Sequence, residues 1–436
     1  MAARTLDPQN SAERLIGLSI AGTWLLWAVG GLYILGPVLG WVLGSMALVR
    51  WYLRVPAPGQ VGGRPVITFA MAAWLIGMGA MLVVLFVGHA NFDHGIGQTI
   101  KSSIGWAKGW ALMALFPLAG ALLAVRPEFV ARAIARLGVQ SMILLPLFAL
   151  APFIGLPGTL WVSPLKIVGG SGPEFFAATL YTIDPSSGLP RWQFFAPWAP
   201  AAGLVATFNI ALLSVERSTR WRVAGICTWT IIALMSQSRL ALVIILLLPA
   251  FFIGFRIIRD PRLLMLGAVV VLLAGIFGPQ LVDALESMIA EFRGARAGSS
   301  RVRETLARIA VERWMSEAPW FGHGIVESGP HLVEYMPIGS HHTWYGLLFV
   351  KGLLGFSCLA VPMAISLVVL MKRSLALREN VIGLAVLVLL VATSFGENLE
   401  VVAYLVWPAL IVFGRSLGLS HGSARGSLVS GRGEPE

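Results

Sequence analysis

Runs of about 20 apolar residues recur along most of this 436-residue chain. A helix needs about 20 mostly apolar residues to cross the roughly 30 Å hydrocarbon core of a bilayer. Hydrophobic residues make up 57% of the chain and charged residues only 12%, which is far from the balance of an ordinary soluble domain. The sequence therefore predicts an all-α polytopic membrane protein.

The spacing of apolar runs and helix breakers predicts about 12 transmembrane helices. We expect them near residues 15–53 (two helices), 65–88, 104–125, 139–156, 197–214, 223–236, 240–256, 263–282, 343–371, 380–395 and 399–415. Gly36, Gly40 and Gly44 follow the four-residue spacing that lets membrane helices approach closely. Residues 1–416 are expected to form a single transmembrane domain, and the Gly-, Ser- and Arg-rich residues 417–436 a flexible cytoplasmic tail.

The net charge of +11 is typical of nucleic-acid binding in a soluble protein, but in a membrane protein it reports orientation first. Basic residues gather in alternate short loops and in the tail. They are Arg50, Arg54 and Arg64; Arg126, Arg132 and Arg136; Arg217, Arg220 and Arg222; Arg256, Arg259 and Arg262; Lys372, Arg373 and Arg378; and Arg415, Arg425 and Arg432. Because Lys and Arg collect on the cytoplasmic side, both termini are expected to be cytoplasmic, and no nucleic-acid partner is expected.

Two long segments, 157–196 and 283–340, then fall on the outer face, the second between the ninth and tenth helices. Within 283–340, the four-residue spacing of an apolar stripe predicts an amphipathic helix over 301–317, either packed on the bundle or lying on the bilayer surface. The stripe consists of Val302, Leu306, Ala310 and Trp314. Segment 157–196 is rich in aromatic rings, which could stack on sugars or bury themselves; burial is favoured.

Six of the seven histidines also map to the outer face, together with Arg191, Arg239 and Arg303. An arginine at membrane depth costs about 2.5–3.5 kcal/mol, so it usually faces a partner or a wet cavity. Arg239 could instead extend to the outer headgroups, and Arg191 could simply pin its loop. The histidine spacings match no standard zinc pattern, so no metal site is predicted.

Together these side chains favour chemistry on an anionic lipid-linked substrate. Arginine forks match phosphate oxygens and keep their charge at any working pH. An imidazole has an ordinary pKa near 6.5 and can accept a proton from an attacking hydroxyl. The adjacent pair His341 and His342 stands at the start of an apolar run, where such a base would meet both water and lipid.

The order of the motifs resembles the O-antigen ligase and O-antigen polymerase superfamily of bacterial polysaccharide assembly over roughly residues 185–415. "SSRVRETLARIAVERWMSEAPWFGHGI" resembles the family's arginine, tryptophan helix and Pro-x-x-Gly-x-Gly turn, and "HHTWYGLLFVKGLLG" resembles its His-Asn/Ser start to a span, closed by Gly-x-x-Gly. "SQSRLAL" resembles its Ser-Arg signature, and "RWQFFAPWAP" more loosely its Arg-x-x-Gly-x-Phe stretch. The positions so placed are Arg191, Arg239, Arg303, Trp314, Pro319, Gly322, Gly324, His341, His342, Gly352 and Gly355.

The resemblance implies a metal-independent, inverting glycosyltransferase in the bacterial inner membrane whose active site faces the periplasm. His341 would be the general base, with His342 as support or substitute, and Gly322 and Gly324 would shape a loop. Arg191, Arg239 and Arg303 would hold the pyrophosphate of an undecaprenyl-linked glycan donor. The chain departs from the pattern after Arg191, where Phe194 stands in place of glycine. No cofactor is implied.

The acceptor distinguishes the two activities of this family. A polymerase of capsule, exopolysaccharide or O-antigen joins lipid-linked repeats to each other, whereas a ligase transfers the glycan to the lipid A core. The sequence around His341 and His342 resembles polymerases slightly more than ligases. The alternatives are a ligase, a hydrolase of the same donor, and a transporter or flippase of lipid-linked sugars. A chain-length regulator is a further partner left open.

Overall fold

The computed structural model describes residues 6–55, 65–170, 172–184, 187–260, 262, 265 and 297–418. Within them the chain is mostly helical, with two short two-stranded antiparallel sheets. The expected span 263–282, the first part of segment 283–340 and the tail beyond residue 418 lie outside the described residues, apart from position 265. The α-helices and strands are α1 Ser11–Ala21, α2 Thr23–Ala28, α3 Leu32–Tyr52, α4 Phe69–Asn91, α5 Ile96–Lys108, α6 Leu112–Leu122, α7 Pro127–Leu150, β1 Thr159–Val162, β2 Ala177–Thr179, β3 Tyr181–Ile183, β4 Pro190–Trp192, α8 Ala199–Leu212, α9 Thr219–Ser236, α10 Arg239–Arg259, α13 Ala297–Glu317, α14 Thr343–Ala376, α15 Val381–Ser394 and α16 Leu399–Gly418.

Six helices of the described chain are long and apolar enough to cross a membrane: α3, α4, α7, α10, α14 and α16. The apolar segment Ala199–Val215 is shorter. The count of about 12 spans therefore stays a prediction. The expected helix at 104–125 is wrong as one continuous span, because the chain breaks at Gly109 and forms α5 and α6 instead.

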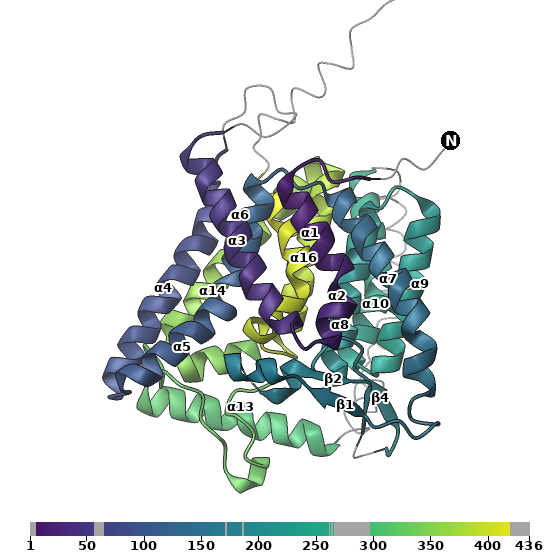
Figure 1. Cartoon of the computed structure of the whole chain (residues 1–436). Helices are drawn as coiled ribbons and strands as arrows, with labels where there is room; N and C mark the ends of the chain where they lie inside the picture. The colour runs from purple at the N-terminus through teal and green to yellow at the C-terminus, as the bar shows by residue number, and fades with distance from the viewer. Residues whose placement is uncertain are drawn as a thin grey trace, which may run out of the picture.

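Helix α16 lies in the middle of the bundle and is its most buried span (Figure 1). Its neighbour α6 approaches so closely that a Cβ at Gly120 would overlap the carbonyl of Ile411, and one at Gly414 would overlap Pro117. Gly36, Gly40 and Gly44 serve α3 in the same way: each faces a side chain of α16 or α6. Small residues at these contacts allow the backbones to pack without lipid between them.

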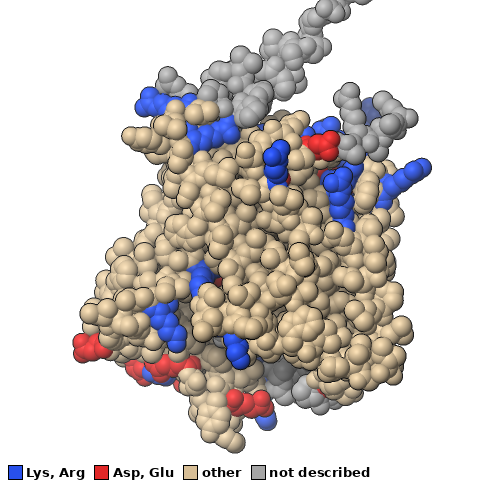
Figure 2. Space-filling model, viewed as in Figure 1, with Lys and Arg blue, Asp and Glu red and all other residues tan. Residues whose placement is uncertain are grey.

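The two ends of the bundle differ in charge. Lys and Arg side chains concentrate at the upper end of Figure 2, whereas most visible Asp and Glu lie at the lower end, which carries α13 and the strands. At the upper end Arg126 binds Glu13 through two N–H groups at 2.9 and 2.7 Å, and Arg132 binds Glu216 at 2.9 and 2.6 Å. These bidentate pairs, the first part-buried and the second buried, tie α7 to α1 and to the segment before α9.

Segment 157–196 forms the cover of the lower end. Strand β1 pairs with β2, and β3 with β4, in antiparallel register. Four phenylalanines of this segment are buried rather than presented to solvent: Phe175, Phe176, Phe194 and Phe195. Trp161 differs, because 47% of it is exposed. The aromatic cluster thus fixes the cover on the bundle.

Helix α14 is interrupted at Gly352, whose φ of 62° and ψ of −165° are not helical. In an unbroken helix the N–H groups of residues 353 and 354 would bind the carbonyls of residues 349 and 350. Here these carbonyls accept hydrogen bonds from the N–H groups of His323 and Gly324, both at 2.9 Å. The freed N–H groups donate to the carbonyls of Pro319 and Trp320, at 2.9 and 3.1 Å. The turn 319–324 is therefore inserted into the helix and supplies partners for these two carbonyls and two N–H groups.

Three histidines fix this inserted turn. The ring of buried His323 bonds the Phe349 carbonyl at 3.0 Å and the Glu317 carboxylate at 2.7 Å. The ring of His89, on α4, bonds the carbonyl of Gly324 at 3.1 Å, and the ring of His94, just after α4, bonds the carbonyl of His323 at 2.9 Å. His89, His94 and His323 thus hold the turn 319–324 in place. Of the six histidines considered in the sequence, His331, His341 and His342 are left as candidates for catalysis.

Helix α13 contains the helix expected at 301–317 and packs on the start of α14. Leu306 and Ala310 of its apolar stripe are buried. Arg313 donates to Glu317 at 2.8 Å and to Glu327 at 2.6 Å, and its guanidinium lies 5.1 Å from the centre of the Phe349 ring. Hydrogen bonds from Arg313 and His323 lower the pKa of Glu317 to about 2. Polar and apolar contacts thus hold α13 against the part of α14 that precedes the break at Gly352.

We predict that Gly322→Ala destabilises the protein. Gly322 has a φ of +66°, and an added Cβ would overlap the backbone of residues 350–352, which cannot move without opening α14. Strain and overpacking together should cost about 1–3 kcal/mol. The measurement is the unfolding midpoint in detergent, with Gly105→Ala as the control because its Cβ would enter open space in α5. Equal midpoints for the two variants would contradict the interlocked turn.

Candidate active site

The two adjacent histidines have different environments. His342 is the N-cap of α14: its Nδ1 accepts a hydrogen bond from the N–H of Tyr345 at 3.3 Å, and its ring packs on the Tyr345 ring at 4.0 Å. The family resemblance aligns His342 with a position that is usually Asn or Ser, and both are strong N-cap residues. One ring nitrogen of His342 is therefore committed to the helix.

His341 is available for chemistry. Its backbone has a φ of 60°, a left-handed conformation that is uncommon outside glycine and is often found at functional sites. Its side chain is 32% exposed, and its Nδ1 lies 4.0 Å from the Glu397 carboxylate. The sharp turn directs the imidazole away from the helix cap and toward this acid.

Glu397 is the site residue that the sequence motifs missed. It stands between α15 and α16, its side chain is 6% exposed, and it accepts a hydrogen bond from Trp198 Nε1 at 3.1 Å. Its carbonyl accepts from the Thr343 hydroxyl at 2.7 Å, and that hydroxyl in turn accepts from the N–H of Leu399 at 3.0 Å. These bonds fix the acid against the start of α14. The available signal was an acidic residue between two apolar runs, in "SFGENLE".

Arg303 on α13 acts electrostatically on both members of this pair. Burial and the positive charge of Arg303 lower the pKa of His341 to about 4. Burial raises the pKa of Glu397 to about 7, against the opposing effects of the Trp198 hydrogen bond and the Arg303 charge. At neutral pH His341 is consequently an unprotonated imidazole beside a carboxyl group that is close to its titration point.

Arg239 begins α10 near the same region. It is the first residue of that helix, after the N-cap Ser238. The next side chain, Leu240, packs on Gly396, so the start of α10 lies against the loop that carries Glu397. The four residues His341, Glu397, Arg303 and Arg239 thus come from four separate segments that meet at the lower end of the bundle.

Arg191 lies behind Arg239, on strand β4. Its guanidinium is 3.5 Å from Asp184 and donates to the carbonyls of Ser236 and Gln237 at 3.4 and 3.5 Å. Arg191 therefore braces the turn that precedes Arg239. Gly322 and Gly324 lie in the turn inserted into α14, with φ values of +66° and +80°.

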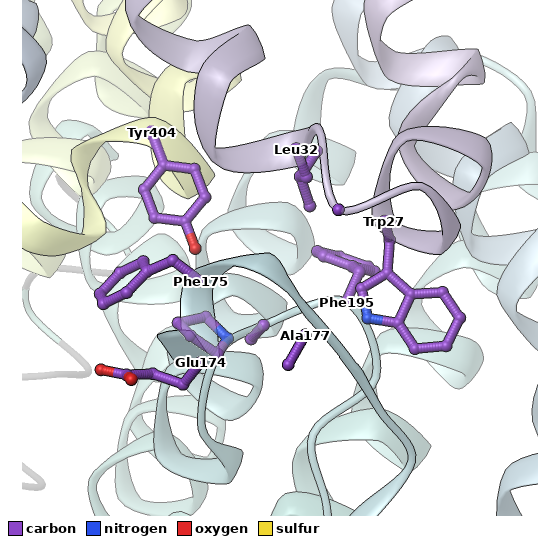
Figure 3. A pocket seen from close by; sticks show the side chains of 10 residues that line it. Trp27, Leu32, Glu174, Phe175, Ala177, Phe195 and Tyr404 are labelled. Carbon is purple, nitrogen blue, oxygen red and sulfur yellow. The ribbon is translucent and has the colours of Figure 1, made fainter. Parts of the chain in front are cut away.

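A narrow aromatic pocket adjoins this site (Figure 3). It lies between the turn from α2 to α3, the cover segment and α16. Tyr404 directs its hydroxyl toward the cover, and the Glu174 carboxylate points outward. Pro197 lines the pocket, and the next residue, Trp198, stacks edge-on against Phe175 at 5.7 Å while it holds Glu397. The buried aromatic side chains thus hold Trp198, which donates the hydrogen bond to the Glu397 carboxylate.

The arrangement combines a proton acceptor with fixed positive charges. No group of three or more His, Cys, Asp or Glu side chains in the described part of the chain is arranged to hold a metal ion. Arginines can bind phosphate oxygens directly, and a neutral imidazole can accept a proton from a hydroxyl. The site therefore has the groups needed to transfer a phosphate-linked substituent to a hydroxyl.

A comparison with protein families agrees with this chemistry. Residues 224–360 match the family model described as O-antigen ligase. The match includes Arg239, Arg303, Gly322, Gly324 and the two histidines, whereas Arg191 and Glu397 lie outside it. No curated protein sequence matches the chain. The match over residues 224–360 supports the resemblance of this membrane protein to the O-antigen ligase and polymerase superfamily.

Proposed function

We propose that the protein is a glycosyltransferase that transfers a glycan from undecaprenyl pyrophosphate to a sugar hydroxyl at the periplasmic face of the inner membrane. The observation that carries the proposal is the placement of partly buried His341 4.0 Å from Glu397, under the charge of Arg303, in a region that matches the O-antigen ligase family model. The basic upper end supports a cytoplasmic placement of that end, which puts the site outside.

The proposed reaction proceeds by direct displacement. The acceptor hydroxyl gives its proton to His341 as its oxygen forms a bond to the anomeric carbon of the donor. The bond from that carbon to the phosphate oxygen breaks, and the electron pair leaves on undecaprenyl pyrophosphate. Arg239 and Arg303 stabilise the negative charge on the leaving group, so the reaction needs no metal ion. Attack opposite the leaving group inverts the anomeric centre.

Among acceptors, we favour a second lipid-linked repeat, which makes the protein a polymerase of an exported or cell-surface polysaccharide. The description of the matched family supports the alternative, transfer to the lipid A core by a ligase. A transporter would need charged groups along a path through the membrane, on both sides of its midplane. The charged groups of this cluster all lie at one end of the bundle, which favours chemistry there over passage.

His341→Ala is expected to abolish transfer, because no second imidazole replaces the base when His342 caps α14. His342→Asn should keep most activity, since Asn preserves the cap. The measurement is polysaccharide formation in a deletion strain that carries each variant at matched protein levels. Full activity of His341→Ala would reject His341 as the base.

Arg239→Lys and Arg303→Lys should each lower the transfer rate about tenfold or more, because lysine keeps the charge but loses the bidentate geometry. Arg308→Lys is the matched control, since Arg308 is an exposed residue of α13 paired with Glu312. Initial rates on lipid-linked donor in purified membranes provide the measurement. Equal rates in all three variants would contradict pyrophosphate binding by Arg239 and Arg303.

The acceptor can be identified in the deletion strain by running its lipopolysaccharide and its extracted lipid-linked glycans side by side on gels. We expect single repeats to accumulate on the lipid while long chains disappear from both fractions, because a polymerase joins repeats. Long glycans that persist on undecaprenyl pyrophosphate, with a bare lipid A core, would instead identify a ligase. Unchanged gels in both fractions would reject both activities for that glycan.

A further inference from the structure

We propose that Glu397 is a positioning residue for His341: it accepts a hydrogen bond from His341 Nδ1–H and balances the positive charge that the imidazole gains during transfer. This inference rests on the proposed function. It concerns a residue outside both the matched family domain and the sequence motifs, brought to the site only by the fold.

The geometry determines which ring nitrogen does which task. Nδ1 of His341 is the nitrogen that faces Glu397, at 4.0 Å. With Nδ1 protonated and directed at the carboxylate, Nε2 is the nitrogen that carries the free electron pair for the acceptor hydroxyl. The separation exceeds a hydrogen bond, but the partly exposed ring can turn toward the acid, and catalytic hydrogen bonds commonly shorten when substrate binds.

The surroundings hold Glu397 more firmly than they hold His341. One carboxylate oxygen accepts the Trp198 N–H, and the backbone carbonyl accepts the Thr343 hydroxyl. Thr343 is only two residues from His341, so a single side chain links the acid to the segment that carries the base. An acid held in place beside the base is the arrangement expected of an orienting group.

The charges around the pair give it a defined protonation state. Arg303 acts on both groups from α13; Arg239 opens α10 beside Gly396; and His342, whose pKa burial lowers, flanks His341. Farther along α16, Glu400 interacts with Lys351.

With the Glu397 carboxyl ionised and the His341 imidazole neutral, the pair can accept one proton. Below pH about 7 the carboxyl already holds that proton, and the remaining imidazole is a weak base.

The test is the pH profile of kcat between pH 5 and 9. Purified full-length protein is reconstituted with undecaprenyl-linked repeats extracted from the deletion strain, and chain extension is measured. Wild type should gain activity with an inflection near pH 7, because deprotonation of Glu397 generates the competent pair. Glu397→Gln should lower kcat at least tenfold and lose this inflection, with little change in KM. Glu397→Asp, which keeps a titrating carboxyl, should retain an inflection.

A second variant tests the same idea without removing the acid. Trp198→Phe keeps an aromatic ring but removes the N–H that stabilises the ionised carboxylate, so the inflection should move to higher pH. Glu334→Gln, at an exposed outer position, is the control and should leave the profile unchanged. The pH profile of Trp198→Phe tests the role of Glu397 even where Glu397→Gln yields no folded protein.

The outcomes separate the two levels of the proposal. Wild-type protein that extends no glycan from this donor would reject the proposed polymerase function. Active wild type whose profile matches those of Glu397→Gln and Trp198→Phe would overturn the role of Glu397 alone. A fall in kcat with an unchanged profile would mean that Glu397 only supports the fold.

Discussion

The insertion of the 319–324 turn into the break of α14 is the contact on which the lower end of the molecule depends. A broken helix inside a membrane protein exposes two carbonyls and two N–H groups, and each is costly where water is scarce. Here all four bind the turn, and glycine at positions 322 and 352 allows the backbones to meet. The interruption thus becomes a joint between α14 and the turn that precedes it in the chain.

That joint determines where the chemistry occurs. By ending the first part of α14 against the turn, it fixes the start of the helix and hence His341. By anchoring Glu317 through His323, it fixes α13, which carries Arg303 toward the same place. The loop before α16 is then bonded to the helix start through Thr343, which adds Glu397. Three segments of the site are therefore located by backbone hydrogen bonds and short side-chain contacts.

Electrostatics within this frame follow from burial. Removal from water favours the neutral forms of both His341 and Glu397, while the fixed charge of Arg303 favours a neutral imidazole and an ionised carboxylate. The opposing effects leave a pair that exchanges one proton near neutral pH. Arginines that cannot lose their charge are suited to the leaving group, and a pair that can gain one proton is suited to the acceptor.

Apolar length and periodicity depend on neighbouring positions, so the amino-acid sequence alone predicts a mostly helical membrane protein and the helix containing 301–317. The roles of the motif residues stay predictions. The sequence overestimated continuity at 104–125, where a local break at Gly109 outweighed the apolar composition. The tertiary structure alone separated His341 from the helix-capping His342, gave Arg191 an acidic partner and brought Glu397 beside the base. The His342 cap and the Arg191–Asp184 pair are local contacts that depend on the backbone conformation of the helix start and of the sheet. The contact between His341 and Glu397 joins segments tens of residues apart, whose distance is set by packing and by the need to satisfy buried polar groups.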